Sequence, residues 1–77
     1  MVEEEELTFG QKAVGLYLNP SGDDAVGNCK QKFADAIDQL NDLRNSTENG
    51  EVKRLCSVAI TESQTAQMWA VKAITWK

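Results

Sequence analysis

The sequence predicts an all-α fold, in which a short N-terminal arm or helix precedes a long antiparallel helical hairpin. Two clusters of turn-forming residues, at 19–24 and 45–50, divide the 77-residue chain into three segments. The second and third segments carry apolar residues at helical spacing, and the connection between them has a length typical of antiparallel neighbours. We therefore expect one hairpin domain made of residues 1–77.

The N-terminal segment has a mixed pattern. Residues 1–8 include a run of four glutamates and are expected to be flexible, whereas residues 9–22 form an arm and a turn. The arm could alternate as an extended strand, and a short helix over residues 12–16 is equally allowed. In both cases we expect it to pack on another element through its apolar residues, which are Leu7, Phe9, Val14, Leu16 and Leu18.

The first long helix is predicted over residues 23–44. Ser21, Asp23 or Asp24 supplies its N-cap, because short polar side chains accept hydrogen bonds from the first amides of a helix. The turn before it either serves only this capping or presents its backbone N–H groups to an anion. Apolar side chains then recur at helical spacing, at Val26, Cys29, Phe33, Ile37, Leu40 and Leu43.

The second long helix is predicted over residues 51–76, and it is apolar on more than one face. Its main stripe consists of Val52, Leu55, Ala59, Ala66, Trp69, Ala73 and Trp76. Six more apolar residues lie off this stripe, namely Cys56, Val58, Ile60, Met68, Val71 and Ile74. One partner helix cannot cover both sets, so we expect several copies of the hairpin to pack together through this helix. The alternative is that the N-terminal segment folds over the second stripe within one monomer.

The composition argues against a metalloprotein or an enzyme. There is no histidine, and two cysteines, Cys29 and Cys56, cannot complete a four-ligand zinc site. We expect both cysteines to be small buried hydrophobes, and carboxylates such as Asp38 to lie on solvated helix faces. Glycine-rich phosphate loops and nucleophile–base pairs are absent from the sequence. We expect no metal, no cofactor and no catalysis.

The charge balance limits the partners. A formal charge of −4 and an isoelectric point near 4.6 argue against a protein that binds DNA. A small phosphate ligand needs only a few local cations, and Lys30 with Lys32, then Lys53 with Arg54, form two local pairs. The acidic start is unlike a targeting signal, and no apolar run approaches the roughly 18 residues of a membrane span. We expect a cytoplasmic protein that does not bind membranes.

Four strings of the sequence are distinctive: FGQKAVG at residues 9–15, NPSG at 19–22, NDLR at 41–44 and above all VAITESQTAQMWAVKAITW at 58–76. Together they resemble the hairpin domain shared by phage anti-CBASS and anti-Thoeris sponge proteins. The resemblance extends over almost the whole chain, and the brevity of the chain is similar to the stand-alone anti-CBASS form. It implies a non-enzymatic immune-evasion protein of a bacteriophage that acts in the cytoplasm of the infected host. Such a protein sequesters cyclic oligonucleotide second messengers without cleaving them, so that CBASS effectors are not activated.

The resemblance also implies a helical hexamer, described as a trimer of dimers, with a first kind of site between two protomers. That site takes cyclic dinucleotides such as cyclic GMP-AMP, through an aromatic side chain near the end of the arm and a lysine on the first helix. Tyr17 is the only aromatic residue beside the turn. Lys30 is the preferred lysine, because it follows an apolar helix position as the family lysine does, and Lys32, which fits the spacing from Tyr17, is the alternative. Asn19 and Ser21 are secondary candidates.

A second kind of site, near the three-fold axes, is implied for cyclic trinucleotides. Arg54 occupies the position of the family's arginine, and a guanidinium fork suits phosphate oxygens. Thr61 and Gln64 match polar positions of the family on this helix, although Thr61 could also bond within its own helix. Lys72 stands where relatives often carry arginine, and its role is open.

Two other functions remain open at this stage. A glycocyclic ADP-ribose sponge of the anti-Thoeris type would use the same hairpin with a different ligand. A structural helical adaptor would use the apolar faces to bind a partner protein and no nucleotide. The residues do not separate these alternatives from the anti-CBASS function.

Overall fold

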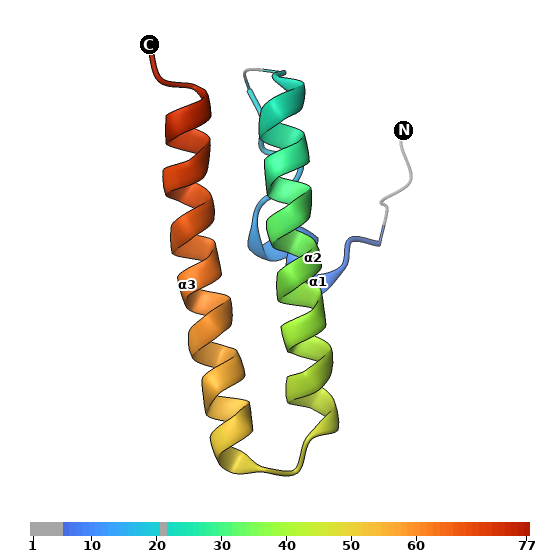
Figure 1. Cartoon of the computed structure of the whole chain (residues 1–77). Helices are drawn as coiled ribbons and strands as arrows, with labels where there is room; N and C mark the ends of the chain where they lie inside the picture. Colours follow the sequence, from blue (N-terminus) through green and yellow to red (C-terminus); the bar gives the residue numbers. More distant parts are fainter. Residues whose placement is uncertain (1–5, 21) are drawn as a thin grey trace.

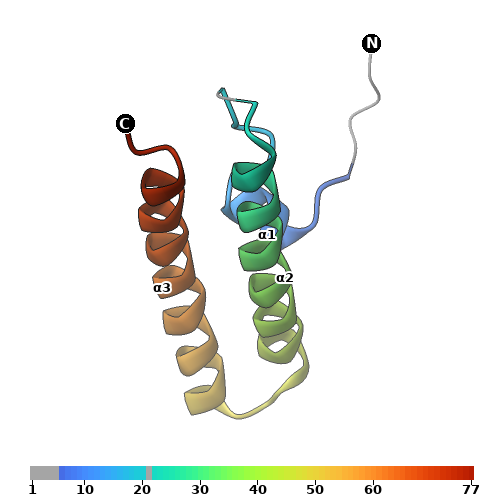
Figure 2. The ribbon, with the colours of Figure 1, turned by 45° about the horizontal axis from the view of Figure 1, so that its top comes forward.

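The computed structural model describes residues 6–20 and 22–77, and within these ranges it contains three helices and no strand. Helix α1 spans Phe9–Ala13, α2 spans Asp24–Ser46 and α3 spans Gly50–Ile74. The two long helices run antiparallel, and α1 packs on α2, as both views show (Figures 1 and 2). The all-α hairpin is confirmed. No helix in the described part of the chain combines the length and apolarity that a membrane span requires.

The long helices begin where short polar side chains cap them. The side chain of Asp23 accepts a hydrogen bond from the amide of Ala25 at 2.8 Å, so Asp23 is the N-cap of α2. The expected alternative Ser21 lies outside the described residues, as do the first five residues of the acidic segment expected to be flexible. Asn49 caps α3 by accepting from the amides of Glu51 and Val52. These caps explain why the turn clusters separate the helices.

The arm forms a short helix and not a strand. Thr8 and Gln11 make a reciprocal capping box, in which each side chain accepts a hydrogen bond from the backbone of the other at 3.0 Å. This box starts α1 at Phe9, three residues before the helix that the sequence allowed. The helix ends at Ala13, and Gly15 then turns the chain with a positive φ of 60°.

Gly10 allows α1 to approach α2 closely. Its amide donates to a carboxylate oxygen of Asp38 at 2.7 Å, and a Cβ atom at this position would lie 2.1 Å from the carbonyl oxygen of Ala34. Asp38 is half-buried, so the expectation that it lies on a solvated face is wrong. The carboxylate satisfies an amide of the first turn of α1, which has no partner within the helix.

The core lies where the three elements meet. Val14 from the arm, Ala34 and Ile37 from α2 and Ile60 from α3 are buried together, and Phe33 and Leu40 pack against them. Cys56 is buried, as predicted, whereas Cys29 is only half-buried.

The buried face of α3 is the one that carries the second set of apolar residues. The buried residues of α3 are Cys56, Ile60 and Gln67, which lie off the main stripe, and Leu55, Trp69 and Trp76 of the main stripe are 52%, 65% and 74% exposed. The arm covers the second stripe in part, as the single-monomer alternative expected: Val14 is buried with Ile60, whereas Val58 and Met68 stay 45% and 62% exposed. One chain therefore leaves a row of large apolar side chains in solvent.

The close approach at Gly10 makes a test of the fold. We expect Gly10→Ala to lower the free energy of unfolding by about 1–3 kcal/mol, because the new methyl group overlaps the Ala34 carbonyl. Gly27→Ala is the matched control, since its Cβ would meet only the Asn19 side chain at 3.8 Å. Alanine within a helix should raise stability by up to about 1 kcal/mol there. Urea unfolding at one fixed chain concentration measures the stability of both variants. A Gly10→Ala variant as stable as the native chain would rule out the close contact between Gly10 and Ala34.

Candidate functional site

Tyr17 lies on the loop between α1 and α2, and its side chain is largely free of protein contacts. The residue is 70% exposed. The loop around it is ordered by backbone bonds, from the Leu18 amide to the Gly15 carbonyl at 2.8 Å and from the Asn19 amide to the Tyr17 carbonyl at 3.1 Å. An exposed phenol on an ordered loop can offer its face to a flat ring and its hydroxyl to a phosphate.

The two candidate lysines on α2 differ in what their ammonium groups contact. Lys30 is only 5% exposed, and its Nζ donates to the backbone carbonyls of Gly15, at 3.0 Å, and of Leu18. Lys32, two residues further along the helix, is exposed. Lys30 is thus engaged by the loop that carries Tyr17, whereas Lys32 faces solvent.

The turn before α2 uses its polar groups internally. The side-chain amide of Asn19 donates to the Asp23 carbonyl at 3.1 Å, and the Gly22 amide donates to the Asn19 carbonyl at 3.1 Å. These bonds fit the capping interpretation of the turn. The other secondary candidate, Ser21, lies outside the described residues.

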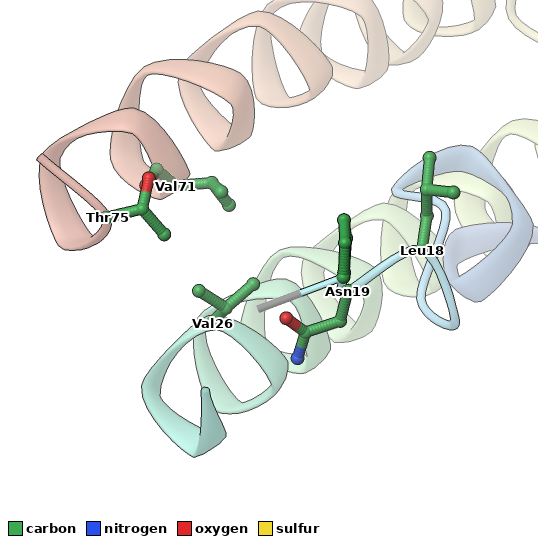
Figure 3. Close-up of a pocket in the computed structure, with 6 residues that line it drawn as sticks. Leu18, Asn19, Val26, Val71 and Thr75 are labelled. Carbon is green, nitrogen blue, oxygen red and sulfur yellow. The ribbon is translucent and has the colours of Figure 1, made fainter. Parts of the chain in front are cut away.

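Two neighbouring hollows lie between this loop and the C-terminal half of α3. The first, of about 460 Å³, is shown in Figure 3, where Leu18, Asn19 and Val26 face Val71 and Thr75 across an open space. The second, of about 440 Å³, shares Leu18 and Val71 with the first. Its polar lining comes from Lys12, Lys30 and Gln67. Tyr17 and Lys32 line neither hollow, so neither of these two hollows gathers all the predicted dinucleotide residues that the structure describes.

Arg54 lies in the second turn of α3 and pairs with a carboxylate of its own helix. Its Nη2 is 2.6 Å from Oε2 of Glu51, and its Nε donates to Oε1 at 3.1 Å. The hydrogen bond from Arg54 lowers the pKa of Glu51 and raises that of Arg54 itself. Both groups are well exposed, so an incoming anion can compete with Glu51 for the guanidinium.

The structure brings Arg54 and Thr61 together but places Gln64 elsewhere. A shallow hollow of about 310 Å³ is lined by Arg54, Ser57, Val58, Thr61 and Glu62. Gln64 instead donates its side-chain amide to the carbonyl of Ala13 at 3.3 Å, which ties α3 to the arm. The Thr61 carbonyl accepts a bond from the Thr65 hydroxyl at 3.2 Å, while Thr61 itself is exposed.

Sequence reasoning missed the structural role of Arg44. Its guanidinium donates to Ser57 Oγ at 2.9 Å and to Asn41 Oδ1 at 2.8 Å, and lies 5.4 Å from the centre of the Phe9 ring. Arg44 therefore links all three helices. The signal for it was the spacing of Asn41 and Arg44, which places both on one face of a helix.

Lys72 has a defined position on the exposed stripe of α3. Its ammonium lies 5.5 Å from the centre of the Trp69 ring and 6.0 Å from that of Trp76. Both distances suit a cation–π contact. Lys72 thus joins the two exposed indoles into one surface.

Comparison with known proteins agrees with the resemblance in the sequence. The profile of one family, described as "Acb2/Tad1, hairpin domain", matches residues 12–75. This range contains Tyr17, both candidate lysines and Arg54. No curated protein and no solved structure matched the chain.

The Glu51–Arg54 pair makes a titration test. Because Arg54 lowers the pKa of Glu51, the pair's contribution to stability is present above the unfolded-chain pKa of Glu51 and is lost as the pH falls through the lower folded value. We expect Arg54→Gln to return the Glu51 pKa toward its usual range, and Lys53→Gln to leave it low, since Lys53 bonds to the Arg44 carbonyl. Carbon NMR of the Glu51 carboxyl measures this. Identical titration curves in the native chain and Arg54→Gln would contradict the pair.

Proposed function

Because this chain belongs to the Acb2/Tad1 hairpin family, we propose that it is a sponge for cyclic nucleotide signals. It binds cyclic oligonucleotide second messengers in the host cytoplasm and lowers the free concentration that a CBASS effector meets. The observation that carries the proposal is the family match over residues 12–75. Sequestration needs tight binding and several sites per particle, and it needs no catalytic group. A nanomolar site corresponds to about −12 kcal/mol.

For cyclic dinucleotides such as cyclic GMP-AMP, we place Tyr17 and Lys32 at the ligand. The exposed ring of Tyr17 can stack on a base, an interaction worth about 1–3 kcal/mol. The exposed ammonium of Lys32 can reach a phosphate, and a hydrogen bond to a charged group contributes about 1.5–3 kcal/mol. Lys30 is the weaker choice for direct contact, because two loop carbonyls already engage its ammonium.

Self-association supplies what one chain lacks. The exposed row formed by Leu55 and Trp69 on α3 and by Trp76 just after it supports packing of α3 against other copies. The assembly we propose is the family's hexamer, a trimer of dimers. In such an assembly a neighbouring chain can close the hollows beside Leu18 and Val71. The dinucleotide pocket then forms between two protomers.

For cyclic trinucleotides we propose a separate site around Arg54 and Thr61. Three copies of Arg54 near a three-fold axis would meet the three phosphates of the ligand. At each guanidinium, a phosphate would replace the Glu51 carboxylate of the same chain. Thr61 lines the same hollow and can add a hydroxyl. Gln64 serves the contact between α3 and the arm in this proposal.

The two kinds of site lie far apart on one chain. Arg54 is near the start of α3 and Val71 is near its end, which at 1.5 Å per residue separates them by about 25 Å. We therefore expect Tyr17→Ala to weaken cyclic GMP-AMP binding about tenfold to a hundredfold and to leave cyclic tri-AMP binding unchanged. Arg54→Ala should do the reverse. Calorimetry with both ligands measures these losses.

The outcomes of that titration separate the alternative functions. Heat with glycocyclic ADP-ribose and not with cyclic GMP-AMP would identify the anti-Thoeris type of sponge. No heat with any of the three ligands would overturn the sponge and leave a helical adaptor. If one of these variants loses binding of both cyclic GMP-AMP and cyclic tri-AMP, the two sites are not separate.

The assembly is tested through the exposed stripe. Because Trp69 is 65% exposed in one chain, Trp69→Glu should leave the hairpin folded and reduce the particle mass at micromolar concentration. Gln39→Glu, at an exposed polar position of α2, is the matched control and should keep the native mass. Sedimentation equilibrium gives the masses. If the native chain sediments as a folded monomer, the proposed pockets between protomers do not form.

A further inference from the structure

We infer that Lys30 is a positioning residue of the dinucleotide site, because its buried ammonium holds the loop of residues 15–18 so that Tyr17 points outward. This inference rests on the proposed function for its effect on binding. Its structural part, the tether between α2 and the loop, rests on contacts within one chain.

The tether joins the two ends of the loop to one cation. Nζ of Lys30 donates to the carbonyl of Gly15 at 3.0 Å and to the carbonyl of Leu18, on either side of Tyr17. Lys30 is only 5% exposed, and a lysine is almost never buried to this extent unless its charge is partnered. The two carbonyls are those partners, so burial of Lys30 and the shape of the loop depend on each other.

The same contacts explain why Tyr17 is exposed. The Gly15 carbonyl also accepts the Leu18 amide at 2.8 Å, and Gly15 has a φ of 60° that non-glycine residues rarely adopt. With the carbonyls of residues 15 and 18 both directed at the ammonium, Leu16 packs against the core and Tyr17 lies on the outer side of the turn. Tyr17 is accordingly 70% exposed while its backbone is fixed.

A fixed loop affects affinity without a contact to the ligand. An aromatic side chain on a loose loop must be ordered when the ligand binds, and this ordering lowers the affinity. In the native chain the Lys30 contacts already order the loop that carries Tyr17 when the chain folds, before any ligand binds. Lys30 would therefore act through Tyr17, whereas Lys32 is proposed to act on the ligand directly.

The first measurement uses the ligand-free protein. The chain has a single tyrosine, so 3-fluorotyrosine gives one fluorine NMR signal that reports on Tyr17. In Lys30→Met, which keeps the apolar stem and removes the charge, we expect this signal to move toward its unfolded-chain position. Lys32→Met, with the same change at an exposed position, should leave it in place. An unchanged signal in Lys30→Met, with native helix content by circular dichroism, would overturn the tether.

The second measurement is a double-mutant cycle on cyclic GMP-AMP binding. We expect Lys30→Met to weaken binding about tenfold in the native background and to have no further effect in Tyr17→Ala. Binding of cyclic tri-AMP should be unchanged, which separates a local effect from unfolding. If Lys30→Met weakens binding equally in both backgrounds, Lys30 contacts the ligand itself and the positioning role is wrong.

A third measurement covers the case in which Lys30→Met does not fold. In the native chain, with six lysines, the tether predicts one ammonium whose protons exchange slowly with water. Fast exchange of all six would overturn it. The native chain could show one slowly exchanging ammonium, and Lys30→Met a shifted fluorine signal, while the native chain binds no cyclic nucleotide. That combination would support the tether and refute the sponge function.

Discussion

The docking of the arm on α2 is the contact on which the rest of the structure depends. Gly10 lets the two backbones meet, and Asp38 accepts the amide that this approach buries. Arg44 lies beside the Phe9 ring, Gln64 binds the Ala13 carbonyl, and Lys30 binds the loop that follows. An arm this short has no core of its own. Its position is therefore set by side chains of α2 and α3, and so is the position of Tyr17.

The polar residues predicted to bind a ligand fall into two groups in the folded chain. Lys30, Gln64 and Asn19 bond to backbone carbonyls of the chain itself, whereas Tyr17, Lys32, Arg54 and Thr61 are exposed. Residue type alone does not distinguish the groups, because a lysine or a glutamine can serve either role. Burial distinguishes them, since a buried polar group needs its partners within the fold. The exposed group is the one available to a ligand.

The hairpin and the cap of α2 could be predicted because turn residues and apolar spacing are local signals. The arm could not be settled from its alternating apolar residues, because the capping box of Thr8 and Gln11 decides it. Which stripe of α3 is buried could not be predicted, since two stripes of similar apolarity do not reveal which neighbour each one meets. Lys30 carried a usable signal. It lies four residues from both Val26 and Ala34, on the core face of α2, where a lysine indicates an internal partner.

The exposed stripe of α3 connects folding with the proposed function. The core of one chain is small, and two large apolar side chains, Trp69 of α3 and Trp76 just after it, lie outside the core beside Lys72. Exposing apolar side chains of this size to water costs free energy, and association with other copies would remove that cost. Arg54 lines a shallow hollow, Tyr17 lines neither hollow beside Leu18, and the two residues lie toward different ends of the hairpin. Association along α3, as proposed above, would therefore stabilise the helices by burying this surface.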